Sequence, residues 1–574
     1  MLIDGRTVAR DSCIECDLCI IGAGPAGLAA AQEFFGQDLR VCLVESGDFE
    51  PDPATQALAD CEVTENDDLY PNPIYAHDRR IGGTASQWDV MLDSGPHLHL
   101  TPLDPADLRA RSWVAHSGWP VEYSTLRTYY ARAQSLCGAG GFDYDPASWS
   151  DESTGPFSFD SGRVVSKMLA TGPQAQFLKA LPRRVAASRN IRLLTWSNAV
   201  ELVTNADANN VRLVRIACLG GNRYRIAARF LILAQGAFEV PRLLLASRAA
   251  APAGLGNGRD LVGRFLMDRQ IVKAGRLVPA TRGGFNRFAF YDLRQVHGRH
   301  VMGKLALSQQ TLAREGILQS LISFSPQDRS LWHRLAERPF GRGTTFRAPA
   351  YRSARALLAA ARDRHRPTRL LRHLARVVGG LDDLMYIKLR GAGYRREFNL
   401  DNGGWTRLPE SDRRFHALDV HQMCEQSPDR ENRLTLSRSH DATGMPLLKV
   451  HLRWHELDIQ SALRTQEIMR EEFRRSGVGE LRIERRGNYP LLAQMSAHHP
   501  SGTTRMSLDP SSGVMDGDCK VHGVGNLFVA SSAVFPTSGN APPTLTIIAL
   551  TLRVCDRIKD LLEPATVELG EMTG

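Results

Sequence analysis

The feature that most constrains the fold of this chain is a glycine-rich turn near its N-terminus. The apolar run Asp17–Ile21 is typical of a buried strand, and the segment Gly22–Gly27 follows it directly. Small and apolar residues through Phe35 then predict a helix, and Leu39–Val44 predicts a second strand that leads into Glu45. This order of strand, glycine turn, helix, strand and acid is typical of a nucleotide-binding α/β domain.

Each part of this segment has a physical role in binding a dinucleotide. Gly22 permits the tight turn, Gly24 lets the backbone approach a pyrophosphate, and Gly27 lets the helix pack against the strand. The helix N-terminus offers unpaired N–H groups and partial positive charge to that pyrophosphate. Glu45 follows Gly27 by 18 residues, where an acid binds ribose hydroxyls. The motif does not separate FAD from NAD, and the lack of a second fingerprint disfavours a flavin reductase with two nucleotides.

Composition places the chain among ordinary globular proteins. The hydrophobic fraction of 43% and the charged fraction of 23% exclude a disordered, collagen-like or low-complexity chain. The formal net charge is +9, but 63 of the 71 basic residues are arginine, a bias that we attribute to coding preference. Because these residues do not cluster beside aromatic ones, we expect no nucleic-acid partner.

Neither a membrane span nor a secretory signal is predicted. No run of 18 apolar residues occurs, and the N-terminus lacks a basic region followed by an apolar segment and a cleavage site. Ten cysteines are too sparse for a disulfide scaffold. Cys13, Cys16 and Cys19 have a spacing that suits an iron–sulfur cluster, but Cys19 lies in a strand-like run and no fourth cysteine follows nearby. We therefore expect no metal and a reduced, cytoplasmic protein.

Several later segments continue the α/β pattern. A second glycine loop covers Arg80–Trp88, and Leu126–Cys137 predicts an amphipathic helix. Phe230–Ala234 predicts a buried strand, and Pro241 suits the first turn of the helix that follows. Near the C-terminus, the strand-like segment 526–532 precedes a strongly apolar helix at 545–558.

These motifs, in this order, resemble the glucose–methanol–choline (GMC) family of flavin oxidoreductases. The similarity covers roughly residues 11–132, 191–269 and 497–562, and a weaker similarity extends from Glu425 to Pro446. His116–Pro120 and His499–Met506 are most similar to bacterial members related to pyranose oxidases and sugar dehydrogenases. The resemblance is specific at the level of the family and does not fix the substrate.

The resemblance implies an α/β fold with a discontinuous, Rossmann-like FAD-binding domain. A second α+β domain then binds substrate and carries a sheet over the flavin. The predicted boundaries are 11–132, 191–274 and 495–574 for the three parts of the FAD domain, 133–190 for a segment on the substrate side, and 275–494 for the substrate domain.

Two residues are expected to carry the chemistry. His499 matches the active-site histidine of the family by register, and a histidine suits the removal of a hydroxyl proton. His498 is one residue out of register. Asn540 falls where relatives carry a histidine and Pro542 where they carry an asparagine, and proline offers no side-chain donor or acceptor. We expect Asn540 to orient the substrate oxygen in place of the missing group; the alternative is a turn residue.

The resemblance also implies a set of residues around the cofactor. The helix beginning near Thr544 is expected to stabilise negative charge on the N1–C2=O edge of the reduced flavin. Gln87 stands where some relatives link FAD to a histidine, so FAD is expected to be non-covalent. The full predicted cofactor set is Gly22, Gly24, Pro25, Ala26, Gly27, Glu45, Ser46, Arg80, Gly82, Gly83, Thr84, Ser86, Gln87, Trp88, Ala234, Gly236, Ser531, Ala541, Pro542 and Thr544.

The middle of the chain, from about 275 to 489, carries few sharp motifs and is expected to supply the sheet that walls the substrate cavity. Leu370, Leu371, Leu374, Val377 and Val378 follow helical spacing among Arg366, Arg369, Arg372 and Arg376. A membrane-surface helix or a lid would fit, but we favour a helix packed against the core. His97 and His99 are interpreted as ordinary loop residues.

The combined reading is an FAD-dependent oxidoreductase that oxidises a CH–OH group of a sugar, glycoside or related alcohol by hydride transfer to flavin N5. The alternative is a redox-neutral flavoprotein, a lyase or an isomerase, and a third reading is an inert FAD-binding module. Oxygen or another electron acceptor, the exact substrate and the oligomeric state are left open by these motifs.

Overall fold

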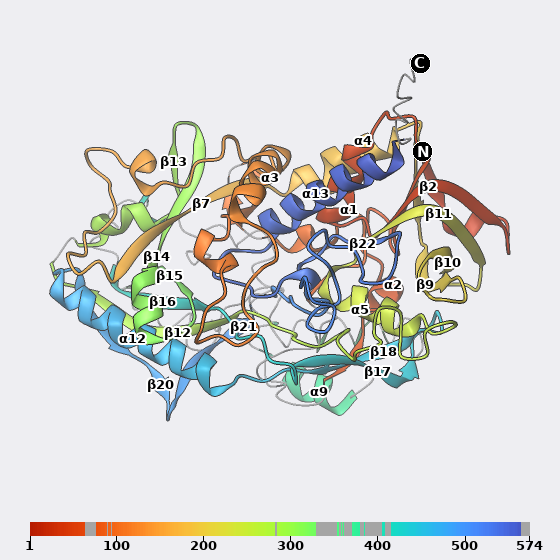
Figure 1. The fold of residues 1–574 in the computed structure, drawn as a ribbon. Coiled ribbons are helices and arrows are strands. Elements are labelled where there is room, and N and C mark those ends of the chain that lie inside the picture. The colour runs from red at the N-terminus through yellow and green to blue at the C-terminus, as the bar shows by residue number, and fades with distance from the viewer. Residues whose placement is uncertain are drawn as a thin grey trace, which may run out of the picture.

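The computed structural model describes residues 1–563 with defined gaps. It leaves out residues 64–75, 89, 93, 282–283, 329–352, 355–356, 359, 361–369, 379–380, 382–383, 385–404, 408–414 and 497. The predicted mixed α/β fold is confirmed: the described residues form three sheets with helices packed against them (Figure 1).

The first sheet joins strands from distant parts of the chain. Its strand order is β1 (Leu2–Asp4), β8 (Ile191–Thr195), β3 (Val41–Val44), β2 (Cys13–Ile21), β11 (Arg223–Leu233), β10 (Val211–Ala217) and β9 (Asn198–Thr204). β22 (Leu527–Val529) pairs with the last three residues of β11. All pairings in this sheet are parallel except those of β10, which is antiparallel to both β11 and β9. The chain therefore returns to this sheet twice after leaving it.

Helices cover this parallel sheet, which explains its apolar strands. They are α1 (Pro25–Glu33), α3 (Tyr123–Leu136), α4 (Leu181–Ala186), α5 (Gly236–Ala246) and α13 (Thr544–Leu562). α1 packs against β2 and β3, and α13 lies against both α1 and α3 (Figure 1). Leu18, Ile20 and Leu43 are completely buried between these layers.

The second sheet is larger and almost wholly antiparallel. Its strand order is β20 (Arg485–Arg486), β21 (Tyr489–Ser496), β12 (Gln270–Pro279), β16 (Phe415–Cys424), β15 (Ser320–Asp328), β14 (Arg299–Leu307), β7 (Val164–Pro173), β6 (Gly95–Leu100) and β5 (Val90–Leu92), with β13 (Arg294–Val296) on β14 and β19 (Gly479–Ile483) on β12. α12 (Glu456–Arg475) packs against it. The sheet thus draws strands from before residue 275 as well as from the middle of the chain, and the domain boundaries given above stay a prediction.

The smaller elements complete the fold. β17 (Arg433–His440), β18 (Pro446–His451) and β4 (Cys61–Val63) form a third sheet beneath α5, and α2 (Pro53–Ala57) and α6 (Gln309–Glu315) are short helices. Among the described residues, no helix combines the length and the apolar composition needed to cross a bilayer.

The position of Pro241 differs from the prediction. α5 begins at Gly236, so Pro241 lies inside the helix rather than in its first turn. Proline has no N–H to donate to the carbonyl four residues earlier, which belongs to Ala237. That carbonyl instead accepts a hydrogen bond of 2.7 Å from Thr503 Oγ1. A side chain from the C-terminal part of the chain therefore satisfies the group that proline leaves unpaired.

The prediction of a core-packed helix at residues 366–378 was partly wrong. The helix forms as α9 (Leu370–Val378), but it does not pack against the core, because no residue in it is buried and Leu371 is 82% exposed. Arg366 and Arg369 lie outside the described residues.

The two histidines of the H-x-H pair were also misplaced. His97 and His99 lie in β6 rather than in a loop, paired with β7. Alternation along the strand turns both to the same side, and burial lowers the pKa of His99 to about 3. No metal-binding cluster occurs among the residues that the structure describes.

Candidate active site

The first glycine turn has the geometry that its sequence predicts. Gly22 follows β2 with a φ of +103°, a conformation that favours glycine, and a Cβ there would lie 2.8 Å from the carbonyl oxygen of Ala234. A Cβ on Gly27 would overlap the carbonyl oxygen of Gly22. The absence of side chains at these two positions therefore lets α1 begin directly against the ends of β2 and β11.

The second glycine loop folds onto the first. Gly82 donates its N–H to the carbonyl oxygen of Ala23 over 2.8 Å, and a Cβ on Gly83 would lie 3.1 Å from the Cα of Gly24. Gly82 and Gly83 both have positive φ, at 88° and 49°. Two segments about 60 residues apart, which sequence patterns placed at one cofactor, are thus in backbone contact.

Glu45 stands at the end of β3 and braces the first turn. Its Oε2 accepts the N–H of Ala23 over 2.8 Å, and its Oε1 accepts the N–H of Gly47 and the hydroxyl of Ser46, each over 3.1 Å. The carboxylate therefore lies beside the glycine turn, where a dinucleotide-binding acid is expected. Ribose binding by Glu45 stays a prediction.

The side chains of the second loop are held by local partners. Ser86 and Gln87 donate to the carboxylate of Asp78, and Arg80 donates to the carbonyl oxygen of Phe49. Trp88 packs edge-on against Phe177 at 5.5 Å between ring centroids. These contacts hold the side chains of the second loop, and they leave the backbone of that loop facing the first glycine turn.

The C-terminal segments complete this end of the sheet. Ala530, after β22, donates its N–H to the carbonyl oxygen of Leu233, and Ser531 caps the short turn that follows. Ala541 is buried, and Pro542 and Pro543 precede the first residue of α13, Thr544. The segments around the end of β11, the end of β22 and the start of α13 therefore carry the last predicted cofactor residues, which are Ala234, Gly236, Ser531, Ala541, Pro542 and Thr544.

His499 lies on a segment that runs antiparallel to the residues before β12. Met267 and Ser501 exchange two backbone hydrogen bonds of 2.9 and 3.0 Å, and the His499 N–H donates to Asp268 Oδ1 over 2.6 Å. His498, the neighbour that is out of register, has a φ of +52°. The backbone of His499 is therefore fixed by a buried carboxylate.

Asn540 lies on a buried loop that is bound through its own backbone. The three residues before it each have a partner: Thr537 accepts from Trp119 Nε1 over 3.0 Å, the Ser538 carbonyl accepts from Arg269, and the Gly539 N–H donates to Glu425 Oε1 over 3.2 Å. Asn540 is itself only 5% exposed.

Beneath this loop lies a cluster of buried charges that sequence analysis missed. Arg111 binds both carboxylate oxygens of Glu425, at 2.8 and 2.6 Å, and Gln319 bridges Glu425 and Asp107 through its N–H and its side-chain amide. Burial would raise the pKa of Glu425, but Arg111 and the bond from Gln319 hold it below its usual range. Burial together with the charges of Asp104 and Glu425 raises the pKa of Asp107 to about 8.

Comparison with known proteins supports the fold and the resemblance to the family. Residues 428–551 match the family model of GMC oxidoreductases. This C-terminal part of the chain is a GMC oxidoreductase domain. The chain is therefore an oxidoreductase, and the predicted FAD is the cofactor that the family supports.

Relatives of this GMC oxidoreductase act on varied alcohols. A 2-methyl-1,2-propanediol dehydrogenase of Mycolicibacterium austroafricanum is 22% identical, over 97% of this chain and 98% of its own. A paromamine 6'-oxidase of Streptomyces fradiae is 23% identical, over 95% and 91%. A C-glycoside 3-oxidase of Arthrobacter globiformis is 35% identical, but the match covers only 25% of this chain and 27% of that protein.

A solved structure shares the fold of this GMC oxidoreductase. The pyridoxine 4-oxidase from Mesorbium loti superimposes with a TM-score of 0.50 at 15% identity, over 95% of this chain and 99% of that one. At this identity the likeness concerns the fold alone.

The residues of this GMC oxidoreductase fit a bound dinucleotide. Gly22, Gly24 and Gly83 together form what we call the glycine cradle. Cβ atoms added at Gly22 and Gly83 would crowd the neighbouring backbone, so the surface of the cradle consists of peptide groups alone. Gln235 Oε1, at the turn after β11, is a buried acceptor without a hydrogen-bond partner among the described residues. Both features suit a ligand rich in phosphate oxygens and donor groups.

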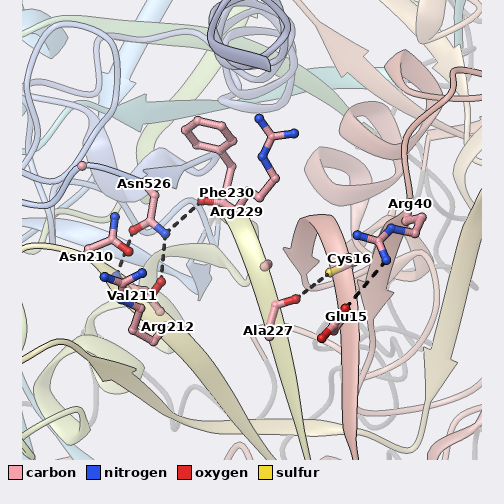
Figure 2. A pocket seen from close by; sticks show the side chains of 12 residues that line it. Glu15, Cys16, Arg40, Asn210, Val211, Arg212, Ala227, Arg229, Phe230 and Asn526 are labelled. Carbon is pink, nitrogen blue, oxygen red and sulfur yellow. Dashed lines mark hydrogen bonds and ion pairs between the residues drawn. The ribbon is translucent and has the colours of Figure 1, made fainter. Parts of the chain in front are cut away.

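A separate surface cavity of about 620 Å³ lies elsewhere on the GMC oxidoreductase (Figure 2). It is lined by Glu15 and Cys16 of β2 and by Ala227–Phe230 of β11, upstream of the carboxyl ends where the glycine turns lie. Arg40 pairs there with Glu15 and Asp17, at 4.0 and 3.3 Å. Because ligands of such sheets bind outside the carboxyl ends of the strands, this cavity is distinct from the candidate cofactor site.

Proposed function

We propose that this GMC oxidoreductase oxidises a CH–OH group of a sugar, a glycoside or a related alcohol, with His499 as the base. Bound FAD supplies the hydride acceptor. The substrate class is supported by the relatives, which include a C-glycoside 3-oxidase, a 2-methyl-1,2-propanediol dehydrogenase and a paromamine 6'-oxidase.

His499 takes the hydroxyl proton in this proposal, since histidine is the side chain whose reference pKa best suits a general base at neutral pH. Asn540 orients the substrate oxygen through its side-chain amide. The N-terminus of α13, which begins at Thr544 directly after two prolines, offers positive dipole potential to negative charge that develops nearby.

The observation that carries this proposal is that the segments bearing His499 and Asn540 are bound to each other. Ser532 Oγ donates to the carbonyl oxygen of Pro500 over 2.7 Å, and the Gly502 N–H donates to the carbonyl oxygen of Ser532 over 3.1 Å. Residues that follow His499 and a residue that precedes Asn540 are thereby joined in one framework. Such rigidity is what general-base chemistry requires of its groups.

We further propose that FAD is held non-covalently. Gln87 stands at the position where some family members carry the linking histidine, and its amide is bonded to Asp78. Precipitating the protein with acid should then release the flavin into the supernatant. Flavin that remains in the pellet after this treatment would contradict the proposal.

We also propose a reducing, cytoplasmic location. The support is that all ten cysteines are free and nine of them are buried.

Anaerobic flavin reduction tests the activity. The purified protein is mixed with a panel of pyranoses, glycosides and simple diols while the absorbance of oxidised flavin is followed. We expect bleaching by one class of alcohol, and His499→Ala should slow it by about 10²–10⁴-fold, the usual contribution of a general base. His498→Ala is the matched control and should bleach at close to the wild-type rate.

The outcomes separate the alternatives. Admission of air after bleaching distinguishes an oxidase, whose flavin reoxidises at once, from a dehydrogenase, which needs another acceptor. A protein that holds FAD but is bleached by no alcohol would overturn the proposal and favour redox-neutral chemistry, for which the proline at 542 is the sequence clue.

A further inference from the structure

The two residues directly before β12 contact both candidate catalytic segments. Asp268 and Arg269 are almost completely buried, at 0% and 1% exposed. They continue the extended segment that pairs with 499–503, in which Gly263 donates to the carbonyl oxygen of Thr503 over 2.7 Å. A Cβ on Gly502 would overlap the carbonyl oxygen of Phe265, so glycine is required for this close approach.

Asp268 fixes the first of these segments. Its Oδ1 accepts the N–H of His499 over 2.6 Å and the N–H of Arg269 over 2.7 Å, while its own N–H donates to Gln426 Oε1 over 2.9 Å. The carboxylate therefore holds the backbone of His499 and the backbone of Arg269 at the same point.

Arg269 fixes the second segment. Its Nη2 donates to the carbonyl oxygen of Ser538, two residues before Asn540. The N–H of the same peptide group, which belongs to Gly539, donates to Glu425 Oε1 over 3.2 Å. A buried cation and a buried anion thus bind the same peptide group, the cation at its carbonyl oxygen and the anion at its N–H.

Burial of the Arg269 guanidinium costs free energy, which indicates that this arginine has a specific role. Nε and Nη1 of Arg269 are buried without a hydrogen-bond partner among the described residues. Burial lowers the pKa of Arg269 to about 10, against the stabilising charges of Glu425, Asp107 and Asp268. A side chain that served only to fill space would be less costly if it were apolar.

We propose that the dipeptide Asp268–Arg269 is the positioning device that sets His499 relative to Asn540, with Asp268 holding the base and Arg269 holding the loop of its partner. This inference rests on the proposed function of those two residues. Neither Asp268 nor Arg269 needs to touch the substrate, because each acts on the backbone of a catalytic segment.

The test compares Arg269→Met with Arg269→Lys in the FAD-loaded enzyme. Methionine removes the charge and the donor at similar length, whereas lysine keeps a donor for Ser538. In stopped-flow flavin reduction, we expect Arg269→Met to lower the limiting rate about 10–100-fold, with a smaller change in the substrate Kd. Arg269→Lys should recover part of that loss.

Arg242 provides the matched control. It is also 1% exposed and makes buried hydrogen bonds, but to Leu58, Pro446 and Asp441, away from both segments. Arg242→Met reports the general effect of removing a buried arginine. A limiting rate that falls as much in Arg242→Met as in Arg269→Met would overturn the proposal, as would an FAD-loaded Arg269→Met enzyme with the wild-type rate.

A readout without turnover separates this inference from the proposed function. Hydrogen exchange of the Gly539 amide should accelerate at least tenfold in Arg269→Met and stay near wild type in Arg242→Met. Unchanged exchange at Gly539 would refute the role of Arg269 even if no alcohol ever reduces the flavin. If Arg269→Met does not fold, Asp268→Asn and Asp268→Ala replace it: asparagine keeps the acceptor for the His499 N–H and should retain most of the rate, whereas alanine should not. Equal rates in these two variants would contradict the proposal.

Discussion

Arg111 and Glu425, 314 positions apart in the chain, form a buried ion pair through two parallel hydrogen bonds of 2.8 and 2.6 Å. The pair connects the segment after β6 to the end of β16, and Glu425 extends the connection to the loop before Asn540. The loop that carries a candidate catalytic residue is therefore anchored in a charged interior rather than in an apolar one.

Breaking this pair on one side should destabilise the protein strongly. Arg111→Met leaves the Glu425 carboxylate buried without its cation, so we expect a loss of about 3–5 kcal/mol in the free energy of unfolding. The double variant Arg111→Met/Glu425→Leu should recover part of this loss because it removes the stranded charge. Urea denaturation measures both. Arg40→Met, at an exposed ion pair, should cost less than about 1 kcal/mol.

The glycine cradle makes a prediction about cofactor retention. Gly27→Ala places a Cβ where the Gly22 carbonyl oxygen lies, so the turn must open and we expect the purified variant to lose most of its FAD. Gly258→Ala is the matched control, since that glycine has open space around it and no positive φ. The ratio of flavin to protein absorbance after gel filtration reports the outcome. Equal flavin content in both variants would contradict the role of Gly27.

The hydroxyl of Thr503 should contribute to the stability of the protein only because α5 contains a proline. Thr503→Val keeps the shape of the side chain but leaves the Ala237 carbonyl buried without a donor, a cost of about 1–3 kcal/mol. Pro241→Ala restores a backbone N–H that is able to bond that carbonyl. We therefore expect the double variant Thr503→Val/Pro241→Ala to be more stable than Thr503→Val alone. Thermal unfolding of the wild type, the two single variants and the double variant forms a double-mutant cycle. If the two substitutions change the stability by strictly additive amounts, this explanation is wrong.

Asp107 predicts a pH dependence of stability with a definite sign. Its pKa is raised from an ordinary value of 3.8 to about 8, so between these two pH values the folded protein holds a proton that the unfolded chain has lost. Stability from this group is therefore complete below about pH 4 and falls as pH rises toward 8, by up to about 1.4 kcal/mol per pH unit. Asp107→Asn should flatten this part of the profile. Parallel slopes for the two proteins in urea denaturation from pH 5 to 8 would rule the effect out.

The glycine turn at the end of the first sheet was predictable because its signals are local. Gly22 and Gly27 are close to the strands and the helix that they serve, and steric limits on the backbone leave few other conformations for such a segment. Glu45 was found for the same reason, since one helix and one strand fix its distance from the turn.

The buried charges were not predictable, because their partners are remote. In this arginine-rich chain, the sequence does not distinguish buried charged residues from ordinary surface ones. Only the fold shows that Arg111, Arg269 and Glu425 meet. Asp268 likewise gave no signal, although its contact with His499 is among the shortest hydrogen bonds at the site. Arrangement of polar groups in an interior depends on contacts between distant segments, which periodicity and motif spacing do not encode.

The placement of β22 has a consequence for how the protein is made. The last residues of β11, Leu231–Leu233, pair on one side with β2 and on the other with Leu527–Val529. A ribosome therefore synthesises the glycine turn about 500 residues before the strand that closes its sheet and the helix that follows. Because domains fold as units once their segments have emerged, this end of the sheet is assembled only after β22 and α13 have been synthesised. Prematurely terminated chains would carry the dinucleotide fingerprint and still be unable to retain the cofactor.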